Sequence, residues 1–453
     1  MRHWFADGVF RTVLRNAGYL GSTKLVGAAL GLIALACAGR GLTPALFGVL
    51  MIIHTYATGA GGLVKFQTWQ YIVRYATPAL LHGDEVRAKD VIRFAFGLDL
   101  ASGMVGMVGA MLLLPWLAGY FGIGGDYLYV ALAYCTLVPT MAEATATGSL
   151  RVLDRFDLIA AQQLVTPLLR GAGALIAYWG DFGLPGFVIA WYVGDLSGDL
   201  VLWGFAVREL KRRGMLDALR PGMFGVARRL PEAWKFVWTT NAAHTVYAAW
   251  GPLSNLVVAT ILGPVAAGLY KIASTLLDSA TKPAELLRRG YYPEIMRLDP
   301  REPRPWLLGL RTGLLAGMAG LVVVGIVLLG GKPLIALAFG AKYLAAFDLL
   351  RLMVFSLAIQ MATFPLESLL YMAGRQRAAL IAQVVAVTAY LMMLGVLTHR
   401  FGLIGAGLAY LLGTVMIALC MLVATLDAYR KRGTLPWSGS GSGSGSGAGA
   451  VPA

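Results

Sequence analysis

Charged side chains are scarce in this chain. Asp, Glu, Lys and Arg make up 13% of its 453 residues, whereas about 25% is usual for soluble domains. The sequence therefore lacks the polar surface of a water-soluble protein. Hydrophobic residues account for 58%, and the mean hydropathy is +0.69. This balance predicts a protein with many membrane-spanning segments. The net charge of +15 lies mostly in short loops between apolar segments, so it does not indicate nucleic-acid binding.

Cysteine is equally scarce, with three residues in the chain. Cys37, Cys135 and Cys420 lie far apart within apolar runs, which excludes a disulfide framework and a cysteine metal site. The sequence shows no nucleophile constellation, no metal-ligand spacing and no glycine-rich phosphate loop. We therefore expect no enzyme activity, no metal and no cofactor.

Twelve apolar stretches follow one another along the chain, and each is close to the roughly 20 residues that cross a bilayer. They predict an all-α polytopic membrane protein with 12 transmembrane helices. The closing stretch, 438–453, is a Gly/Ser linker that we exclude from the fold. The apolar stretches lie at 14–38, 44–64, 94–119, 127–150, 158–179, 184–206, 234–262, 264–287, 308–330, 343–371, 376–398 and 402–426.

Basic residues alternate between the two sides of this series. Nearly all Lys and Arg residues outside the spans lie on the side that holds both termini and the central linker. The opposite side holds Arg40, Lys332, Lys342 and Arg400. Loops rich in Lys and Arg stay in the cytoplasm. The sequence therefore predicts an inner-membrane protein with both termini in the cytoplasm.

The chain contains an internal repeat. Leu42-Thr-Pro-Ala-Leu-Phe-Gly-Val-Leu50 matches Leu262-Gly-Pro-Val-Ala-Ala-Gly-Leu-Tyr270 at an offset of 220. Phe182-Gly-Leu-Pro-Gly-Phe-Val-Ile-Ala-Trp-Tyr-Val-Gly194 matches Phe401-Gly-Leu-Ile-Gly-Ala-Gly-Leu-Ala-Tyr-Leu-Leu-Gly413 at 219. We predict two parallel six-helix lobes, 1–206 and 234–437, joined by a basic cytoplasmic linker at 207–233. Parallel repeats are a transporter architecture with the substrate between the halves.

Polar residues recur on one face of spans 1, 2, 7 and 8, which the repeat relates in pairs. A charge at mid-bilayer costs about 2.5–3.5 kcal/mol on insertion scales, so embedded charges face a cavity or one another. We predict a shared, water-filled, net-basic cavity between the halves. For Lys282 the alternative is snorkelling to the head groups, and for His244 it is helix packing. The cavity residues are Lys24, His54, Asn241, His244, Asn255, Lys271, Asp278 and Lys282.

Charged residues also occur in spans 5 and 6. Arg170 lies near the middle of span 5, and Asp195 and Asp199 lie one turn apart on span 6. A buried Arg is best satisfied by a carboxylate, so one interpretation is a structural ion pair. In the other, Arg170 binds an anionic head group or the two Asp residues bind a coupling cation such as H⁺ or Na⁺. Asp278 and Glu143 are further candidates for ion coupling.

Several motifs resemble the bacterial polysaccharide (oligosaccharide) flippases of the multidrug/oligosaccharidyl-lipid/polysaccharide exporter superfamily. Gly21-Ser-Thr-Lys24-Leu-Val-Gly27 looks like the first helix of that family, and Gly41-Leu-Thr-Pro-Ala-Leu-Phe-Gly48 looks like the turn that follows it. Gly331-Lys-Pro-Leu-Ile-Ala-Leu-Ala-Phe-Gly340-Ala-Lys-Tyr343, followed by Leu349-Leu-Arg351, is similar to the family signature between spans 9 and 10. The Gly374-Arg375 turn also fits, and the resemblance covers about residues 12–430.

The resemblance implies a flippase that exports undecaprenyl-pyrophosphate-linked oligosaccharide repeat units for surface polysaccharide such as O-antigen by alternating access. It also implies a basic central cavity. In that cavity we assign Lys24, Arg170 and Lys271 to binding of the pyrophosphate. Partners would be this lipid-linked oligosaccharide, membrane lipids, and the polymerase and export machinery of the pathway. The relatives that flip the peptidoglycan precursor have two additional helices, which disfavours that substrate.

Two other interpretations stay open. A cation-coupled multidrug antiporter of the same superfamily predicts an acid-rich cavity, whereas the stripes here are net basic. A membrane-bound polysaccharide polymerase or acyltransferase generally needs a large extracytoplasmic loop or a paired His/acid site. No loop on the predicted outer side exceeds about twelve residues.

Overall fold

The structure of the chain is a computed structural model that describes residues 8–220, 225–226, 232–296 and 298–434. Every element assigned in these ranges is helical, which confirms the all-α prediction. The elements are α1 (Gly8–Gly41), α2 (Pro44–Val64), α3 (Thr68–Leu81), α4 (Glu85–Leu117), α5 (Gly125–Tyr134), η1 (Cys135–Leu137), α6 (Ala144–Val152), α7 (Phe156–Trp179), α8 (Gly183–Arg212), η2 (Leu216–Leu219), α10 (Glu232–Ile295), α11 (Pro303–Phe339), η3 (Ala341–Tyr343), α12 (Ala345–Met353), α13 (Phe355–Met372), α14 (Gln376–Arg430) and η4 (Arg432–Thr434).

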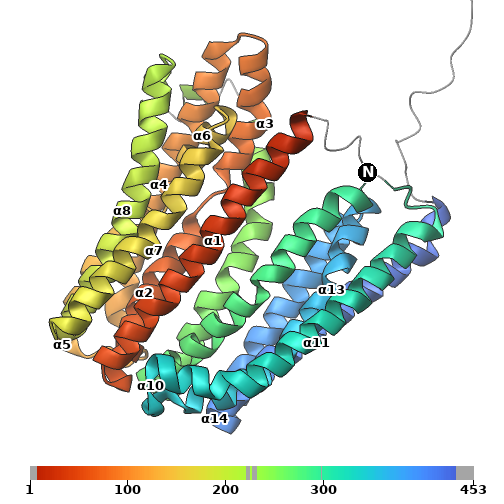
Figure 1. The fold of residues 1–453 in the computed structure, drawn as a ribbon. Coiled ribbons are helices and arrows are strands. Elements are labelled where there is room, and N and C mark those ends of the chain that lie inside the picture. Colours follow the sequence, from red (N-terminus) through yellow and green to blue (C-terminus); the bar gives the residue numbers. More distant parts are fainter. Residues whose placement is uncertain (1–7, 221–224, 227–231, 297, 435–453) are drawn as a thin grey trace, which may run out of the picture.

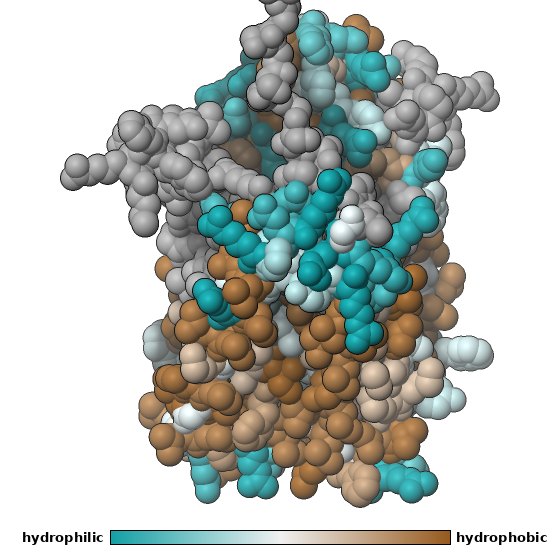
Figure 2. Space-filling view, turned by 90° about the vertical axis from the view of Figure 1, so that its right-hand side faces the viewer, coloured by the Kyte–Doolittle hydropathy of each residue, from teal (hydrophilic) through white to brown (hydrophobic). Residues whose placement is uncertain are grey.

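The helices form two bundles, α1–α8 and α10–α14, which lie side by side (Figure 1). Their connections gather at two ends of the molecule. We call one the Arg40 end (connections 42–43, 118–124, 180–182 and 340–344) and the other the Arg155 end (82–84, 153–155, 213–215 and 373–375). The distribution of Lys and Arg predicts that the Arg40 end is periplasmic. Figure 2 shows one side of the molecule, where hydrophobic residues cover the lower part. Hydrophilic residues gather above them, towards the Arg155 end, and a few more lie at the lower edge.

Two long elements, α10 and α14, each contain two of the predicted spans. The chain turns at Gly263 (φ 82°) and at Gly402 (φ 60°), conformations that glycine adopts without strain. At the second turn a Cβ on Gly405 would lie 1.9 Å from the carbonyl oxygen of Leu397, so the two arms of α14 fold back on each other. Both turns fall at predicted boundaries between spans.

Six helices in the described part of the chain are long and apolar enough to cross a membrane, and Val26–Gly41 is a shorter apolar helix. The total of twelve spans and the side of the termini therefore stay predictions. Span 2 is followed by α3, a helix that the hydropathy pattern did not predict. Span 4 is not one helix but α5, η1 and α6 with a bend between them. Pro139 follows η1, and a proline lacks the N–H that would continue a helix there.

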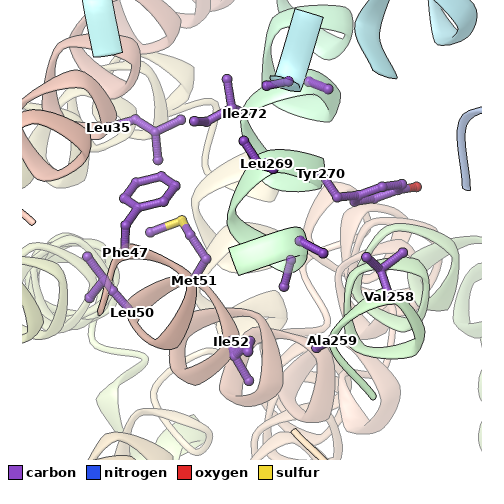
Figure 3. Close-up of a cluster of buried hydrophobic side chains, with 14 of the residues drawn as sticks. Leu35, Phe47, Leu50, Met51, Ile52, Val258, Ala259, Leu269, Tyr270 and Ile272 are labelled. Carbon is purple, nitrogen blue, oxygen red and sulfur yellow. The ribbon is translucent and has the colours of Figure 1, made fainter. Parts of the chain in front are cut away.

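The largest buried cluster joins the two bundles (Figure 3). Phe47 and Met51 of α2 and Ile272 of α10 are each at most 1% exposed. Lipid tails are as apolar as these side chains, so close packing rather than the hydrophobic effect holds such helices together. Gly48 permits the closest approach: a Cβ there would lie 1.9 Å from the Pro264 carbonyl oxygen.

The chain between the bundles docks on the first one. Arg93 of α4 donates to the carbonyl oxygen of Asp217 in η2 at 2.9 Å. Trp234, in the first turn of α10, packs edge-on against Phe94 at 5.2 Å between ring centroids. The predicted lobe boundary at 207–233 stays a prediction, since these contacts do not define where one lobe ends.

Candidate functional site

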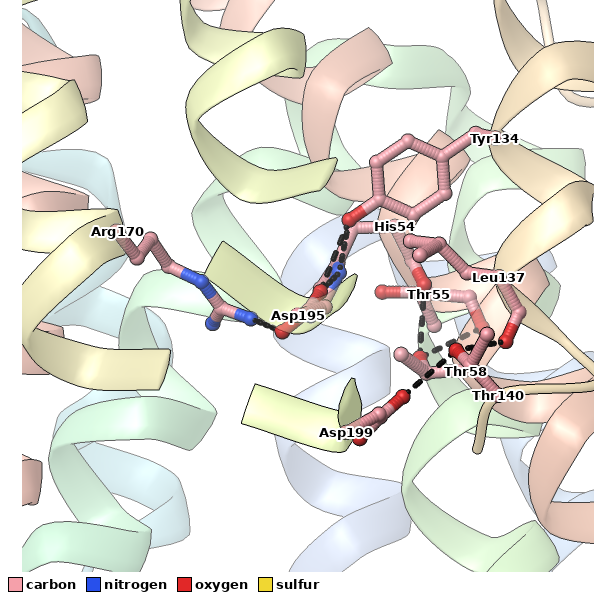
Figure 4. Close-up of polar contacts among 9 residues, drawn as sticks. All are labelled: His54, Thr55, Thr58, Tyr134, Leu137, Thr140, Arg170, Asp195 and Asp199. Carbon is pink, nitrogen blue, oxygen red and sulfur yellow. Dashed lines mark hydrogen bonds and ion pairs between the residues drawn. The ribbon is translucent and has the colours of Figure 1, made fainter. Parts of the chain in front are cut away.

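The bend in span 4 places polar groups beside α2 and α8. Tyr134 ends α5, and Thr140 and Glu143 lie between η1 and α6. Broken helices at membrane depth occur where the backbone is buried in protein or lines a cavity. Here the bend directs three side chains towards charged residues of neighbouring helices. Figure 4 shows the contacts of two of them, Tyr134 and Thr140.

Arg170 of α7 forms an ion pair with Asp195 of α8, with side chains 19% and 12% exposed. The helices approach closely here because Gly194 has no side chain: a Cβ would lie 3.1 Å from the Arg170 backbone nitrogen. The Arg170 guanidinium also lies 5.5 Å from the ring centroid of Trp191. The structure thus confirms that Arg170 pairs with an Asp of span 6.

His54 and Tyr134 occupy the other side of the same carboxylate. The Tyr134 hydroxyl donates to Asp195 Oδ2 at 3.1 Å and shares a hydrogen bond of 3.0 Å with His54 Nδ1. His54 Nδ1 lies 3.6 Å from Asp195 Oδ2. Asp195 therefore stands between a permanent cation and a residue whose charge depends on protonation.

A second group of carboxylates lies towards the Arg155 end. Thr140 donates to Asp199 Oδ2 at 2.8 Å, and Lys65 of α2 pairs with Glu143 at 2.9 Å, each side chain 27% exposed. Asp199 and Glu143 both line a pocket of about 380 Å³ between α6, α7 and α8. Its other lining residues are Thr147, Arg151, Ile159, Gln162, Gln163, Thr166 and Leu202.

Lys271 approaches this cluster from the other bundle. It is partly exposed and lies within electrostatic range of Arg170, His54 and Asp278. Arg170 lies nine residues before the end of α7 and Lys271 eight residues after the turn at Gly263. At about 1.5 Å per residue, both are roughly 12–14 Å from the Arg40 end, near the middle of a bilayer core of about 30 Å.

The remaining predicted site residues are more scattered. Asn255 is buried and donates to the Ala267 carbonyl oxygen at 3.2 Å, so it joins the two arms of α10. Asn241 is 5% exposed, and the described residues give its Oδ1 no partner. Lys282 is partly exposed and Asp278 is exposed. The side chains of Lys24 and His244 lie outside the described residues.

Charges of opposite sign are nearly equal in number in this region. The described cations Lys65, Arg151, Arg170, Lys271 and Lys282 stand against the described carboxylates Glu143, Asp195, Asp199 and Asp278. The net-basic cavity stays a prediction. Because Arg170 is paired with Asp195, an anion at Arg170 would have to replace this carboxylate or arrive together with a cation.

Comparison with known proteins identifies the family. A model of the family described as "Polysaccharide biosynthesis protein" matches residues 40–285. Inner membrane protein YghQ of Escherichia coli (strain K12) is 52% identical over 350 residues, which cover 77% of this chain and 99% of that protein.

Solved structures show the same fold at low identity. An inward-facing multidrug resistance MATE family transporter of the MOP superfamily superposes with a TM-score of 0.67 at 16% identity, covering 92% of this chain and 95% of the other. The lipid II flippase MurJ, in its inward closed conformation, gives a TM-score of 0.66 at 12% identity, covering 92% and 90%. These neighbours are transporters and flippases and not enzymes. The chain is thus a multi-pass inner-membrane protein with a MATE- and MurJ-like transporter fold, and it belongs to the polysaccharide biosynthesis protein family.

Proposed function

We propose that this protein is a flippase that moves undecaprenyl-pyrophosphate-linked oligosaccharide repeat units from the cytoplasmic to the periplasmic leaflet by alternating access. The observation that carries the proposal is that Arg170 and Lys271, from opposite bundles, lie at the same depth near mid-membrane and within electrostatic range of each other. The proposal includes twelve spans and cytoplasmic termini. It is supported by the family of the chain and by a fold shared with a lipid flippase.

The chemistry of the two cations suits a pyrophosphate. A guanidinium binds phosphate oxygens in a bidentate manner, and an ammonium acts as a compact point charge. In the present conformation Arg170 is occupied by Asp195. Head-group binding would exchange this carboxylate for a phosphate, and Asp195 would turn to Tyr134, His54 or a bound cation. This exchange would link substrate binding to a coupling ion, with Asp199 and Glu143 as the nearest further carboxylates.

A membrane potential would assist this transport. Moving one charge through an interior-negative potential changes its free energy by about 2.3 kcal/mol per 100 mV. A head group with two uncompensated negative charges would gain roughly twice this on moving outward, and a co-transported cation would reduce the gain.

The lipid-linked saccharide pool of a deletion strain tests the proposal. Loss of the protein should trap complete repeat units on the cytoplasmic side, and the wild-type gene should release them. Arg170→Met and Lys271→Met at matched expression should fail to do so. Arg220→Met removes an exposed cation that pairs with Asp217 and should complement fully. Full complementation by both site variants would contradict the assignment of the site. An unchanged lipid-linked saccharide pool in the deletion strain would contradict the proposed function.

A multidrug antiporter is the second candidate, and the grouping of Asp195, Asp199 and Glu143 in one bundle favours it. It predicts that the deletion strain becomes sensitive to cationic drugs while its lipid-linked saccharides stay normal. The same strain therefore separates the two functions.

A further inference from the structure

Two helices from opposite bundles end beside each other at the Arg40 end. Arg40, in the last turn of α1, donates from Nε to the carbonyl oxygen of Ala338 at 3.0 Å and from Nη2 to that of Leu337. Both carbonyls belong to the last turn of α11. The cation of one bundle thus caps the helix end of the other.

The contact is reciprocal. Lys342, in the η3 turn that follows α11, donates to the carbonyl oxygen of Leu42 at 2.6 Å and to that of Arg40 at 3.3 Å. These carbonyls lie at the end of α1 and directly after it. Each bundle therefore contributes one cation and one helix end.

Helix ends suit this arrangement because their last four carbonyl groups lack partners within the helix. They also carry the negative end of the helix dipole, which favours a nearby cation. The acceptors in these four hydrogen bonds of Arg40 and Lys342 are main-chain oxygens, so the bonds exist only while the two helix ends are adjacent. Separation of the bundles at this end would break all four together.

The repeat shows that this contact is asymmetric. The segment 115–122 matches 333–340 at an offset of 218 through its Pro, Phe and Gly residues, so Gly124 of the first half stands at the position of Lys342. Gly122 packs against the other bundle, since a Cβ there would lie 2.9 Å from Pro264 Cδ. The connections of both halves therefore pack on the opposite bundle at this end, but a cation stands at the position of Lys342 only in the second half.

We propose that Arg40 and Lys342 form a latch that holds the Arg40 end of the two bundles closed. The latch rests on the alternating access of the proposed function and is independent of the substrate. When the bundles separate at this end, both cations lose their carbonyl acceptors. Their removal therefore favours the state that is open at the Arg40 end.

Distances between spin labels test the latch in the full-length protein in nanodiscs. Cys37, Cys135 and Cys420 are first replaced by Ser or Ala. Labels are then attached through Asp126→Cys and Arg400→Cys, two exposed positions at the Arg40 end of different bundles. In Arg40→Ala/Lys342→Ala, the ratio of long to short distances should rise by about threefold to tenfold over the unsubstituted protein.

Two controls keep the result specific. Lys332→Ala removes an exposed cation near the same end and should leave the distances unchanged. Lys342→Arg keeps a cation beside the same carbonyls and should also preserve them. Distances in the double variant equal to those of Lys332→Ala would overturn the latch, even with lipid-linked saccharide export intact. If the deletion strain shows that the proposed substrate is wrong, a shift in these distances would still support the latch.

Discussion

Gly48 and Gly268, which occupy the same position in the two halves of the repeat, touch each other across the boundary of the bundles. A Cβ on Gly268 would lie 3.3 Å from the Cα of Gly48. Residues related by a two-fold axis can meet only where that axis passes between them. The contact therefore supports the predicted parallel repeat and places its axis between α2 and the second arm of α10.

Gly48→Ala should weaken the closed arrangement. The added methyl group would lie 1.9 Å from the Pro264 carbonyl oxygen, and overpacking of this kind costs about 1–3 kcal/mol or more. Gly31→Ala is the matched control, because a Cβ there meets nothing within 4 Å. This second change should be neutral or stabilise the helix by up to about 1 kcal/mol. Thermal unfolding in detergent checks the prediction, and equal melting temperatures for the two variants would contradict it.

Two glycines related by the repeat pack against different kinds of residue. Gly194 packs against Arg170, and Gly413, its counterpart at an offset of 219, packs against Tyr390, with a Cβ 3.0 Å from Tyr390 Cβ. Tyr390 stacks on Trp250 at 3.9 Å and donates to Ser254 at 2.7 Å. The residue packed on this glycine thus carries a charge in the first bundle and an aromatic hydroxyl in the second.

A double substitution separates the two roles of Arg170. Arg170→Met leaves Asp195 without its cation and should destabilise the protein by about 3 kcal/mol, the lower end for buried pairs because both side chains keep some exposure. Arg170→Met/Asp195→Asn should recover most of that stability. If Arg170 binds the head group, the double variant stays inactive in saccharide export. Recovery of export together with stability would show a purely structural pair.

Tyr134→Phe tests the contact that sequence reasoning missed. The change removes a hydroxyl that donates to Asp195 and contacts His54. We expect a loss of about 0.5–1.5 kcal/mol in stability and weaker export, because Asp195 loses one of its three partners. Unfolding and export are measured side by side. An unchanged export rate in this variant would mean that the orientation of Asp195 is irrelevant to transport.

Much of this arrangement was accessible from the sequence. Hydropathy and repeat spacing predicted the turns at Gly263 and Gly402, and the cost of an embedded charge gave a carboxylate partner for Arg170 as one of two interpretations. Tyr134 and Thr140 were missed because 127–150 forms one apolar stretch, and hydropathy does not register a bend inside it. Pro139 was the residue in this stretch that could have indicated the bend. Which Asp pairs with Arg170 depends on the packing of Gly194, which spacing alone does not specify.

Exchange of Lys65 and Glu143 tests whether that pair is structural. Each side chain is 27% exposed, so the pair contributes no more than about 1 kcal/mol. Lys65→Glu alone places two carboxylates side by side and should reduce folded yield. Lys65→Glu/Glu143→Lys restores opposite charges and should restore it. If the exchanged protein folds but no longer exports saccharide, Glu143 has a role beyond pairing.

The central claim is tested most directly by following an undecaprenyl-pyrophosphate-linked saccharide across the bilayer of proteoliposomes that contain the purified protein. An impermeant glycosidase reports how much saccharide has moved, with the potential set by a potassium gradient and valinomycin. We expect transfer that requires Arg170 and Lys271 and that accelerates when the potential drives negative charge in the direction of transfer. Transfer at the same rate by Arg170→Met and Lys271→Met, or by the wild-type protein at every potential and proton gradient, would contradict it.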